Sequence, residues 1–424
     1  MKQDSGLSRL GTTVFSTVAR TLIMTIAKRI QLRSVPSVIA IAPILVILAT
    51  LPMLSGSTLA VAEDRAAPHF EVDPYWPQPL PNHWVLGSAI GVGVDSRDHV
   101  YVIHRRNSFN ERTEIGAVAQ PPTGTCCIPA PNILEFDPEG RLVKAWGGAG
   151  EDYVWPESNH GLTLDHKDNI WIGGNGGKDS HILKFTRDGR FLQQIGIPGQ
   201  AADSLSKTHF GRVAKISFDA NANEAYVSDG YSNKRVAVLN ADTGAFKRFW
   251  GAYGNRPDDT NLGRYDPAAP PAQQFRNPVH CAEPSNDGLV YVCDRANDRI
   301  QVFRTDGSYV TEKFIEPMTL GDGSVWDIAF SRDPEQKFMF VADGKNMKVY
   351  VMERKSLDIL TSFGDGGRQP GQFFAVHSIA SDSKGNLFTT ETYEGKRVQK
   401  FVYRGLRPVS KQDQGVPWGK RIIE

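Results

Sequence analysis

A pattern of two short alternating strands joined by a polar turn recurs six times along the chain, and it restricts the possible folds more than any other sequence feature. In several units a third and a fourth strand follow, joined by Asp-Gly between apolar residues, which is the strongest short signal for a β-hairpin. Each unit therefore predicts a four-stranded antiparallel sheet. The first strands of the six units end at Asp95, Asp165, Asp219, Ser285, Ser331 and Asp382.

Repetition of four-stranded units predicts an all-β fold, a six-bladed β-propeller in which each unit forms one blade around a central axis. The pattern is that of NHL-type repeats. The stretch from Phe70 to Trp76 precedes the first unit, and we expect it to supply a strand that closes the ring and removes exposed sheet edges. We assign residues 63–404 to the propeller and residues 405–424 to a C-terminal tail.

Residues 1–62 differ in composition from the repeats. Basic residues precede an apolar run from Val38 to Leu54, and Ala60-Val61-Ala62 comes directly before two acidic residues. This order is typical of a secretory signal peptide. An uncleaved signal anchor is the alternative, because the apolar run is only slightly shorter than a membrane span. In both cases we expect an exported protein, periplasmic or secreted, that contacts a membrane only through such an anchor.

Export implies an oxidising compartment, which bears on the four cysteines. Cys281 and Cys293 fall on neighbouring strands of one predicted hairpin, and Cys126 and Cys127 are adjacent in the sequence. Disulfides and buried thiols are both consistent with this spacing, and no C-x-x-C metal motif is present. The formal net charge of +1 gives no reason to expect a nucleic-acid partner.

One position of the repeat carries histidine in alternate units. It lies five residues before the turn Asp or Ser, on the first strand, which lines the axis of a propeller. Because alternate blades are about 120° apart around the axis, three such side chains converge on one point. Three imidazoles with an open fourth position form a catalytic zinc site, although imidazole also suits copper, iron and nickel. The six residues at this position are Ile90, His160, Ala214, His280, Trp326 and His377.

The second strand of each unit runs back to the end of the blade where the histidines lie. Arg105, Tyr231 and Arg295 follow the second strands of the first, third and fourth units. Two guanidinium groups beside a metal favour a small-molecule or peptide substrate with a carboxylate, because the guanidinium fork matches that group. The alternatives are solvated rim positions for the arginines and a packing role for the tyrosine. We interpret His104 as structural.

The chain resembles the peptidyl-α-hydroxyglycine α-amidating lyase family over roughly residues 75–404. The most specific stretches are His160-Gly161-Leu162, Val227-Ser-Asp-Gly-Tyr231-Ser-Asn and Asp294-Arg295-Ala-Asn-Asp-Arg-Ile-Gln. The resemblance implies a propeller with a catalytic zinc and a structural calcium. It implies zinc ligation by His160, His280 and His377, catalytic roles for Tyr231, Arg105 and Arg295, and calcium ligation by the backbone carbonyls of Val92 and Leu162.

The chain also departs from that family. The family's calcium-binding Asp after the last zinc histidine is Ser378 here, and its Met two residues before that histidine is Ala375. The family's disulfide positions fall on residues such as Ser232 and Val302. Calcium binding is therefore left open, and we expect the histidine metal chemistry to be kept and the substrate to differ.

Together these observations predict a metal-dependent carbon–nitrogen lyase that cleaves an α-hydroxyglycine-type (carbinolamide) substrate to an amide and glyoxylate. Two alternatives stay open. The same site could serve another metal-dependent reaction, such as ester or lactone hydrolysis. The chain could also be a non-catalytic binding propeller of the periplasm.

Overall fold

The computed structural model describes residues 65–119, 121, 123–124 and 126–419. The chain divides into two compact units, Met1–Ala60 and Val61–Glu424, and every described residue lies in the second. The signal or anchor expected over residues 1–62 lies outside the described residues. Within the described residues, no helix is long and apolar enough to cross a membrane.

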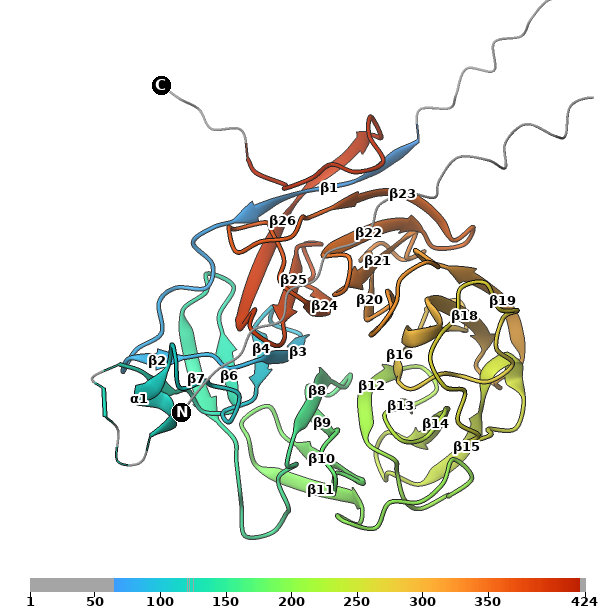
Figure 1. The fold of residues 1–424 in the computed structure, drawn as a ribbon, viewed down its shortest axis with the longest axis horizontal. Coiled ribbons are helices and arrows are strands. Elements are labelled where there is room, and N and C mark those ends of the chain that lie inside the picture. The colour runs from blue at the N-terminus through green and yellow to red at the C-terminus, as the bar shows by residue number, and fades with distance from the viewer. Residues whose placement is uncertain (1–64, 120, 122, 125, 420–424) are drawn as a thin grey trace, which may run out of the picture. The chain divides into compact units, whose positions relative to one another are not determined.

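The second unit is built from six four-stranded sheets around a central axis, which confirms the predicted six-bladed all-β propeller (Figure 1). The innermost strands are β3 (Ala89–Val94), β8 (Asn159–Leu164), β12 (Val213–Asp219), β16 (Val279–Pro284), β20 (Asp327–Phe330) and β24 (Val376–Ser381). The second strands are β4 (Val100–His104), β9 (Ile170–Gly174), β13 (Glu224–Asp229), β17 (Leu289–Asp294), β21 (Phe338–Asp343) and β25 (Leu387–Glu391).

The outer half of each blade contains a third and a fourth strand. The third strands are β6 (Ile133–Phe136), β10 (His181–Phe185), β14 (Arg235–Asn240), β18 (Arg299–Arg304), β22 (Lys348–Glu353) and β26 (Arg397–Pro408). The fourth strands are β7 (Leu142–Trp146), β11 (Phe191–Gly196), β15 (Phe246–Trp250), β19 (Tyr309–Phe314), β23 (Asp358–Phe363) and β1 (Ala66–Asp73). Short elements between them are β2 (Trp84–Val85), α1 (Ile115–Val118), β5 (Ile128–Pro129), η1 (Ala252–Gly254) and η2 (Arg295–Asn297).

In each blade the second strand is more buried than the fourth. All five residues of β4 are buried, whereas the residues of β7 are intermediate or exposed. This difference arises because neighbouring blades cover both faces of the second strands. The predicted Asp-Gly turns join third and fourth strands at Gly189 and Gly307, whose φ values of 82° and 93° are readily adopted only by glycine.

Strand β1 closes the ring, as the sequence predicts. It pairs antiparallel with β26 and so becomes the fourth strand of blade 6, which otherwise consists of the last three strands of the chain. Phe70 of β1 is 2% exposed, and its ring lies 5.3 Å from Phe340 and 5.5 Å from Phe363 of blade 5. The two ends of the repeat region are therefore joined by backbone hydrogen bonds and by aromatic packing.

The end of the chain packs back onto the same region. Residues 405–408, which the sequence assigns to the tail, continue β26. Beyond them, the amides of Ser362 and Gly364 donate to the carbonyls of Gln412 and Gly415 at 2.7 and 2.8 Å. The amide of Val72 donates to the carbonyl of Pro417 at 2.8 Å. These bonds cover the backbone edges of β23 and β1.

Both cysteine pairs are disulfides. Cys281 of β16 is bonded to Cys293 of β17, and Cys126 is bonded to Cys127 in the loop after β4. Of the two arrangements left open by the sequence, the structure therefore has the bridged one. Two disulfides favour an extracellular or secretory-pathway location.

Phe70 gives a test of the ring closure. We expect Phe70→Ala to lower the free energy of unfolding by about 3–5 kcal/mol, because a buried aromatic side chain between blades 5 and 6 is removed. Tyr75→Ala is the matched control, since Tyr75 is 86% exposed just beyond the same strand. Chemical denaturation followed by fluorescence measures both variants. Equal stability of the two variants would contradict a stabilising role for β1.

Candidate metal centre

The three predicted histidines meet on the propeller axis. Each is the second residue of an innermost strand, His160 on β8, His280 on β16 and His377 on β24. Their ring centroids lie 4.8, 4.9 and 5.2 Å apart, and one nitrogen of each lies within 4.8 Å of the others. All three side chains are buried, with 2–3% exposure. The convergence expected from the repeat is therefore present.

The backbone of the next blade orients two of these imidazoles. Nδ1 of His160 lies 2.7 Å from the carbonyl oxygen of Ala214, and Nδ1 of His280 bonds to the carbonyl oxygen of Trp326. A carbonyl only accepts hydrogen bonds, so Nδ1 carries the proton and Nε2 keeps its lone pair. Outer hydrogen bonds of this kind fix the tautomer of metal-binding histidines.

His377 is held differently. Its Nδ1 lies 3.4 Å from the hydroxyl of Ser378, and that hydroxyl donates to the carbonyl of Ile90 at 3.2 Å. Ile90 occupies the same position of the repeat as Ala214 and Trp326. A serine hydroxyl therefore stands between the third histidine and the carbonyl that corresponds to the two direct anchors.

Burial keeps the imidazoles neutral. It lowers the pKa of His160, His280 and His377 well below the usual value, and nearby positive charge from Arg295 lowers the pKa of each further. Neutral imidazole is the form that binds metal. Three neutral nitrogen donors on one axis fit zinc with an open fourth position, and they fit other first-row transition ions as well.

Tyr231 lies directly against the histidines. It follows β13, and its hydroxyl is 2.8 Å from Nε2 of His160 and 3.1 Å from Nε2 of His280. The preceding residue has to be small, because a Cβ on Gly230 would lie 2.1 Å from the carbonyl oxygen of Val279. The close approach of this turn to β16 places the phenol beside the histidines.

Arg295 also faces the site and is 6% exposed. Its Nη1 donates to the Tyr231 hydroxyl at 3.4 Å, and its guanidinium lies 4.6 Å from the centre of the Trp326 ring. Its Nη2 forms an ion pair with the carboxylate of Asp322 at 3.8 Å. The Nε atom of Arg295 is buried and has no hydrogen-bond acceptor among the described residues. This guanidinium therefore has capacity left to bind an anion.

Arg105 follows β4 and is held by blade 2. Its Nη2 donates to the side-chain oxygen of Asn175 at 2.8 Å, and its Nε donates to the carbonyl of Asn159 at 3.3 Å. Burial lowers its pKa, partly offset by Tyr231. The neighbouring His104 is structural, as the sequence indicates: Nε2 lies 2.9 Å from the carbonyl oxygen of Pro131, and the amide of Gly87 donates to Nδ1 at 3.0 Å.

The residues expected to bind calcium do not fit that ion. Val92 on β3 and Leu162 on β8 can offer only neutral backbone carbonyls. Ser378 stands where the resemblance places a carboxylate, and its hydroxyl already donates to Ile90. Calcium sites in proteins use carboxylates to balance the charge of the ion. Other carboxylates near the axis, Asp327 and Glu283, are bound by Lys215.

Sequence reasoning missed the residues that support the site. Trp326 stacks on Arg295 and anchors His280; its signal was its place in the same repeat position as the histidines. Asn175 and Asn159 hold Arg105 from another blade and carry no comparable signal. Each of these contacts joins two different units of the repeat.

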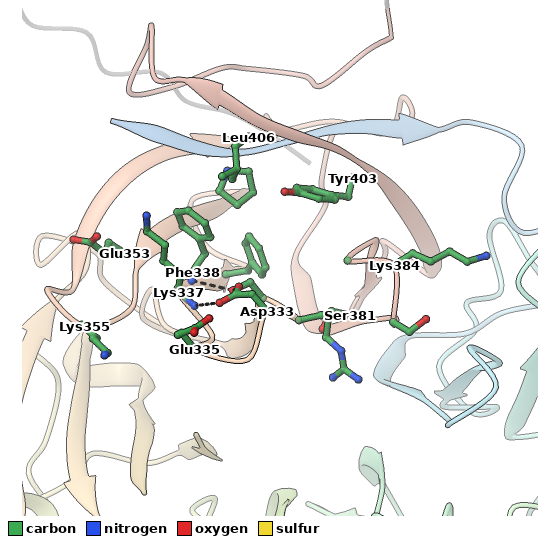
Figure 2. A pocket seen from close by; sticks show the side chains of 16 residues that line it. Asp333, Glu335, Lys337, Phe338, Glu353, Lys355, Ser381, Lys384, Tyr403 and Leu406 are labelled. Atoms are coloured by element: carbon green, nitrogen blue, oxygen red, sulfur yellow. Dashed lines mark hydrogen bonds between the residues drawn. The ribbon is translucent and has the colours of Figure 1, made fainter. Parts of the chain in front are cut away.

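A cavity of about 700 Å³ lies away from this centre, around the turns that follow β20 and β24 (Figure 2). These turns are at the other end of the innermost strands from the histidines. Phe338, Tyr403 and Leu406 form part of its apolar wall, and lysines such as Lys337 and Lys384 contribute charge. None of the predicted site residues lines this cavity.

The sequence is similar to two groups of known proteins. The chain is 24% identical over 354 residues to NHL repeat-containing protein 3 of Mus musculus, covering 79% of this chain and 84% of that protein. It is 23% identical over 402 residues to peptidylglycine alpha-amidating monooxygenase of Rattus norvegicus, covering 87% of this chain and 38% of that protein. The chain is an NHL-repeat propeller distantly related to both.

Other amidating monooxygenases give the same result. The chain is 26% identical over 339 residues to peptidyl-glycine alpha-amidating monooxygenase B of Xenopus laevis, covering 77% of this chain and 35% of that protein. The chain thus spans little more than a third of the length of these enzymes. No family model matches the chain.

Metal content tests the centre directly. We expect purified protein to contain about one equivalent of a transition metal, with zinc as the first candidate. His280→Ala should lose it, because two imidazoles hold zinc far less tightly than three. His69→Ala is the matched control, since His69 bonds to Gln414 far from the axis. Elemental mass spectrometry measures all three proteins. A wild-type protein that stays metal-free after zinc loading would contradict the assignment.

Proposed function

We propose that the protein is a metal-dependent lyase that cleaves the C–N bond of an α-hydroxyglycine-type substrate, giving an amide and glyoxylate. The main support is the meeting of three imidazole nitrogens with the Tyr231 hydroxyl and the buried Arg295 guanidinium. The distant relationship to amidating monooxygenases is in agreement with this chemistry.

The two arginines define the expected substrate class. Arg295 is buried and its Nε is without an acceptor among the described residues. Arg105 has its guanidinium oriented by Asn175 and Asn159. A carboxylate on the substrate would balance this positive charge and satisfy the fork geometry of a guanidinium. We therefore expect a small molecule or a peptide that ends in a carboxylate beside the carbinol carbon.

The proposed reaction balances without an oxidant or reductant. The carbinol hydroxyl loses its proton, and the carbon–oxygen bond becomes the aldehyde of glyoxylate. The carbon–nitrogen bond breaks, and the nitrogen leaves as an amide after it gains a proton. A metal ion held by the three imidazoles would supply Lewis-acid polarisation of the hydroxyl.

Tyr231 is the group placed to move the proton. Its hydroxyl lies within 3.1 Å of two histidine nitrogens, so a substrate hydroxyl at the open position would be its neighbour. Positioned acid–base groups at hydrogen-bond distance are the usual means of such transfers. Arg295 donates to the same phenol and fixes its orientation.

Tyr231→Phe separates this role from metal binding. We expect the variant to keep its metal while turnover of a peptidyl-α-hydroxyglycine falls about 10²–10⁴-fold, the usual contribution of an acid–base group. Glyoxylate release measures turnover, and Tyr75→Phe serves as the control at an exposed position. Normal turnover with retained metal would show that another group moves the proton. Wild-type hydrolysis of a lactone but not of the α-hydroxyglycine would favour a hydrolase.

Arg295→Gln tests the carboxylate assignment. We expect kcat/KM for the carboxylate substrate to fall about 10²–10³-fold, because a charged donor is lost from a buried site. The methyl ester of the same substrate should be affected much less, since it has no charge to pair. Comparing both substrates in both proteins isolates this interaction. An equal loss on the two substrates would mean that Arg295 does not bind the carboxylate.

A further inference from the structure

A buried group of three charged side chains lies on the innermost strands, close to the histidine positions. Lys215 follows Ala214 on β12, and Asp327 follows Trp326 at the start of β20. The Lys215 ammonium lies 2.6 Å from Oδ1 of Asp327 and 2.7 Å from Oε1 of Glu283 on β16. These side chains are 2–16% exposed. One cation is therefore shared by two carboxylates from different blades.

Further hydrogen bonds satisfy these carboxylates. The hydroxyl of Ser217 donates to Glu283 at 2.7 Å. The amide of Ile379 on β24 donates to Oδ2 of Asp327 at 3.1 Å. The group thus connects the innermost strands of blades 3, 4, 5 and 6. Burial opposes the charge on Lys215, but Asp327 and Glu283 outweigh it and raise the pKa of the ammonium.

The two ends of this group stand beside the carbonyls that orient the histidines. Lys215 is bonded in sequence to Ala214, the acceptor for His160. Asp327 is bonded to Trp326, the acceptor for His280. A shift of either strand would therefore move an imidazole anchor. The ion group can hold these two anchors at a constant spacing.

The residues that the resemblance assigns to calcium, and the carboxylates beside Lys215, offer a divalent ion no comparable place. The donor set of Val92, Leu162 and Ser378 lacks a carboxylate. Asp327 and Glu283 are engaged by the ammonium. The sulfur of Cys281, which lies near them, is bonded to Cys293 and is not a thiolate.

We propose that the Lys215 ammonium is the structural cation of the propeller axis and replaces a divalent ion in that role. It cross-links the strands of blades 3, 4 and 5 and positions the carbonyl anchors of two metal-binding histidines. The inference concerns stability and cation dependence, so it does not depend on which reaction the site performs.

The first test is a calcium titration of wild-type protein freed of metals and reloaded with one equivalent of zinc. We expect the melting temperature to stay constant up to millimolar calcium, and calorimetry to detect no calcium binding. Chelators are left out because they would also remove zinc. A stoichiometric calcium site that raises the melting temperature would overturn the proposal.

Lys215→Met supplies the second test. The variant keeps much of the side-chain volume but leaves two buried carboxylates without their cation. We expect its melting temperature to fall by roughly 5–10 °C, because breaking a buried ion pair from one side is strongly destabilising. Calcium should bind between the two carboxylates and restore most of the loss. Zinc affinity should fall and recover in parallel, since the imidazole anchors are affected.

Two further variants complete the design. Lys215→Arg retains a cation and should remain independent of calcium. Lys215→Met combined with Asp327→Asn and Glu283→Gln removes all three charges and should show no response to calcium. If Lys215→Met folds only with calcium present, the proposal is supported. A Lys215→Met protein as stable as wild type, or one that ignores calcium while zinc affinity is unchanged, would refute it.

Discussion

Closure of the ring is the constraint on which the other features of this protein depend. Pairing of β1 with β26 joins the first described residues of the propeller to the third strand of blade 6. Without that pairing blade 6 would have three strands and an open edge. With it, six sheets enclose one axis, and residues at equivalent positions of their innermost strands face one another. His160 and His377, separated by most of the propeller sequence, reach a centroid distance of 4.8 Å in this way.

Alternate blades also contribute different groups to the histidine cluster. Blades 2, 4 and 6 supply imidazoles, and blades 3 and 5 supply the carbonyls of Ala214 and Trp326 that hold two of them. His160 and His280 therefore each depend on the neighbouring blade for their tautomer. The contact between blades 6 and 1 is the exception, because Ser378 intervenes before the carbonyl of Ile90. That exception occurs where the two ends of the repeat region meet.

Much of this arrangement could be predicted from the sequence because it follows from a repeat. A residue's place within one unit determines its strand and its distance from the axis. The same reasoning located His280 on an innermost strand and Tyr231 after a second strand. The same reasoning, applied to the next position of the repeat, places Lys215 and Asp327 on innermost strands as well. Their contact was not predicted, because each charge has an ordinary interpretation within its own unit.

Contacts between side chains of different units could not be predicted, because a residue's place within its own unit does not determine the direction of its side chain across a blade boundary. Arg295 stacks on Trp326, and Arg105 donates a hydrogen bond to Asn175. Both contacts depend on side-chain directions across blade boundaries. The resemblance to a known family agrees with the structure for the three histidines, whereas Ser378 lacks the carboxylate that the resemblance implies for calcium.

The distribution of charge along the axis connects stability with function. The side chains of Lys215, Asp327 and Glu283 have partners in ion pairs and hydrogen bonds with one another, with Ser217 and with the amide of Ile379, and so suit a structural role. Arg295 differs, because its guanidinium is buried while its Nε has no acceptor among the described residues. Burying a donor in that state costs free energy unless a ligand offsets it. Proteins tolerate such costs mainly at functional sites. A guanidinium whose Nε has no acceptor, beside the three imidazoles, therefore supports the proposal that a substrate carboxylate binds near Arg295 rather than at the ion cluster.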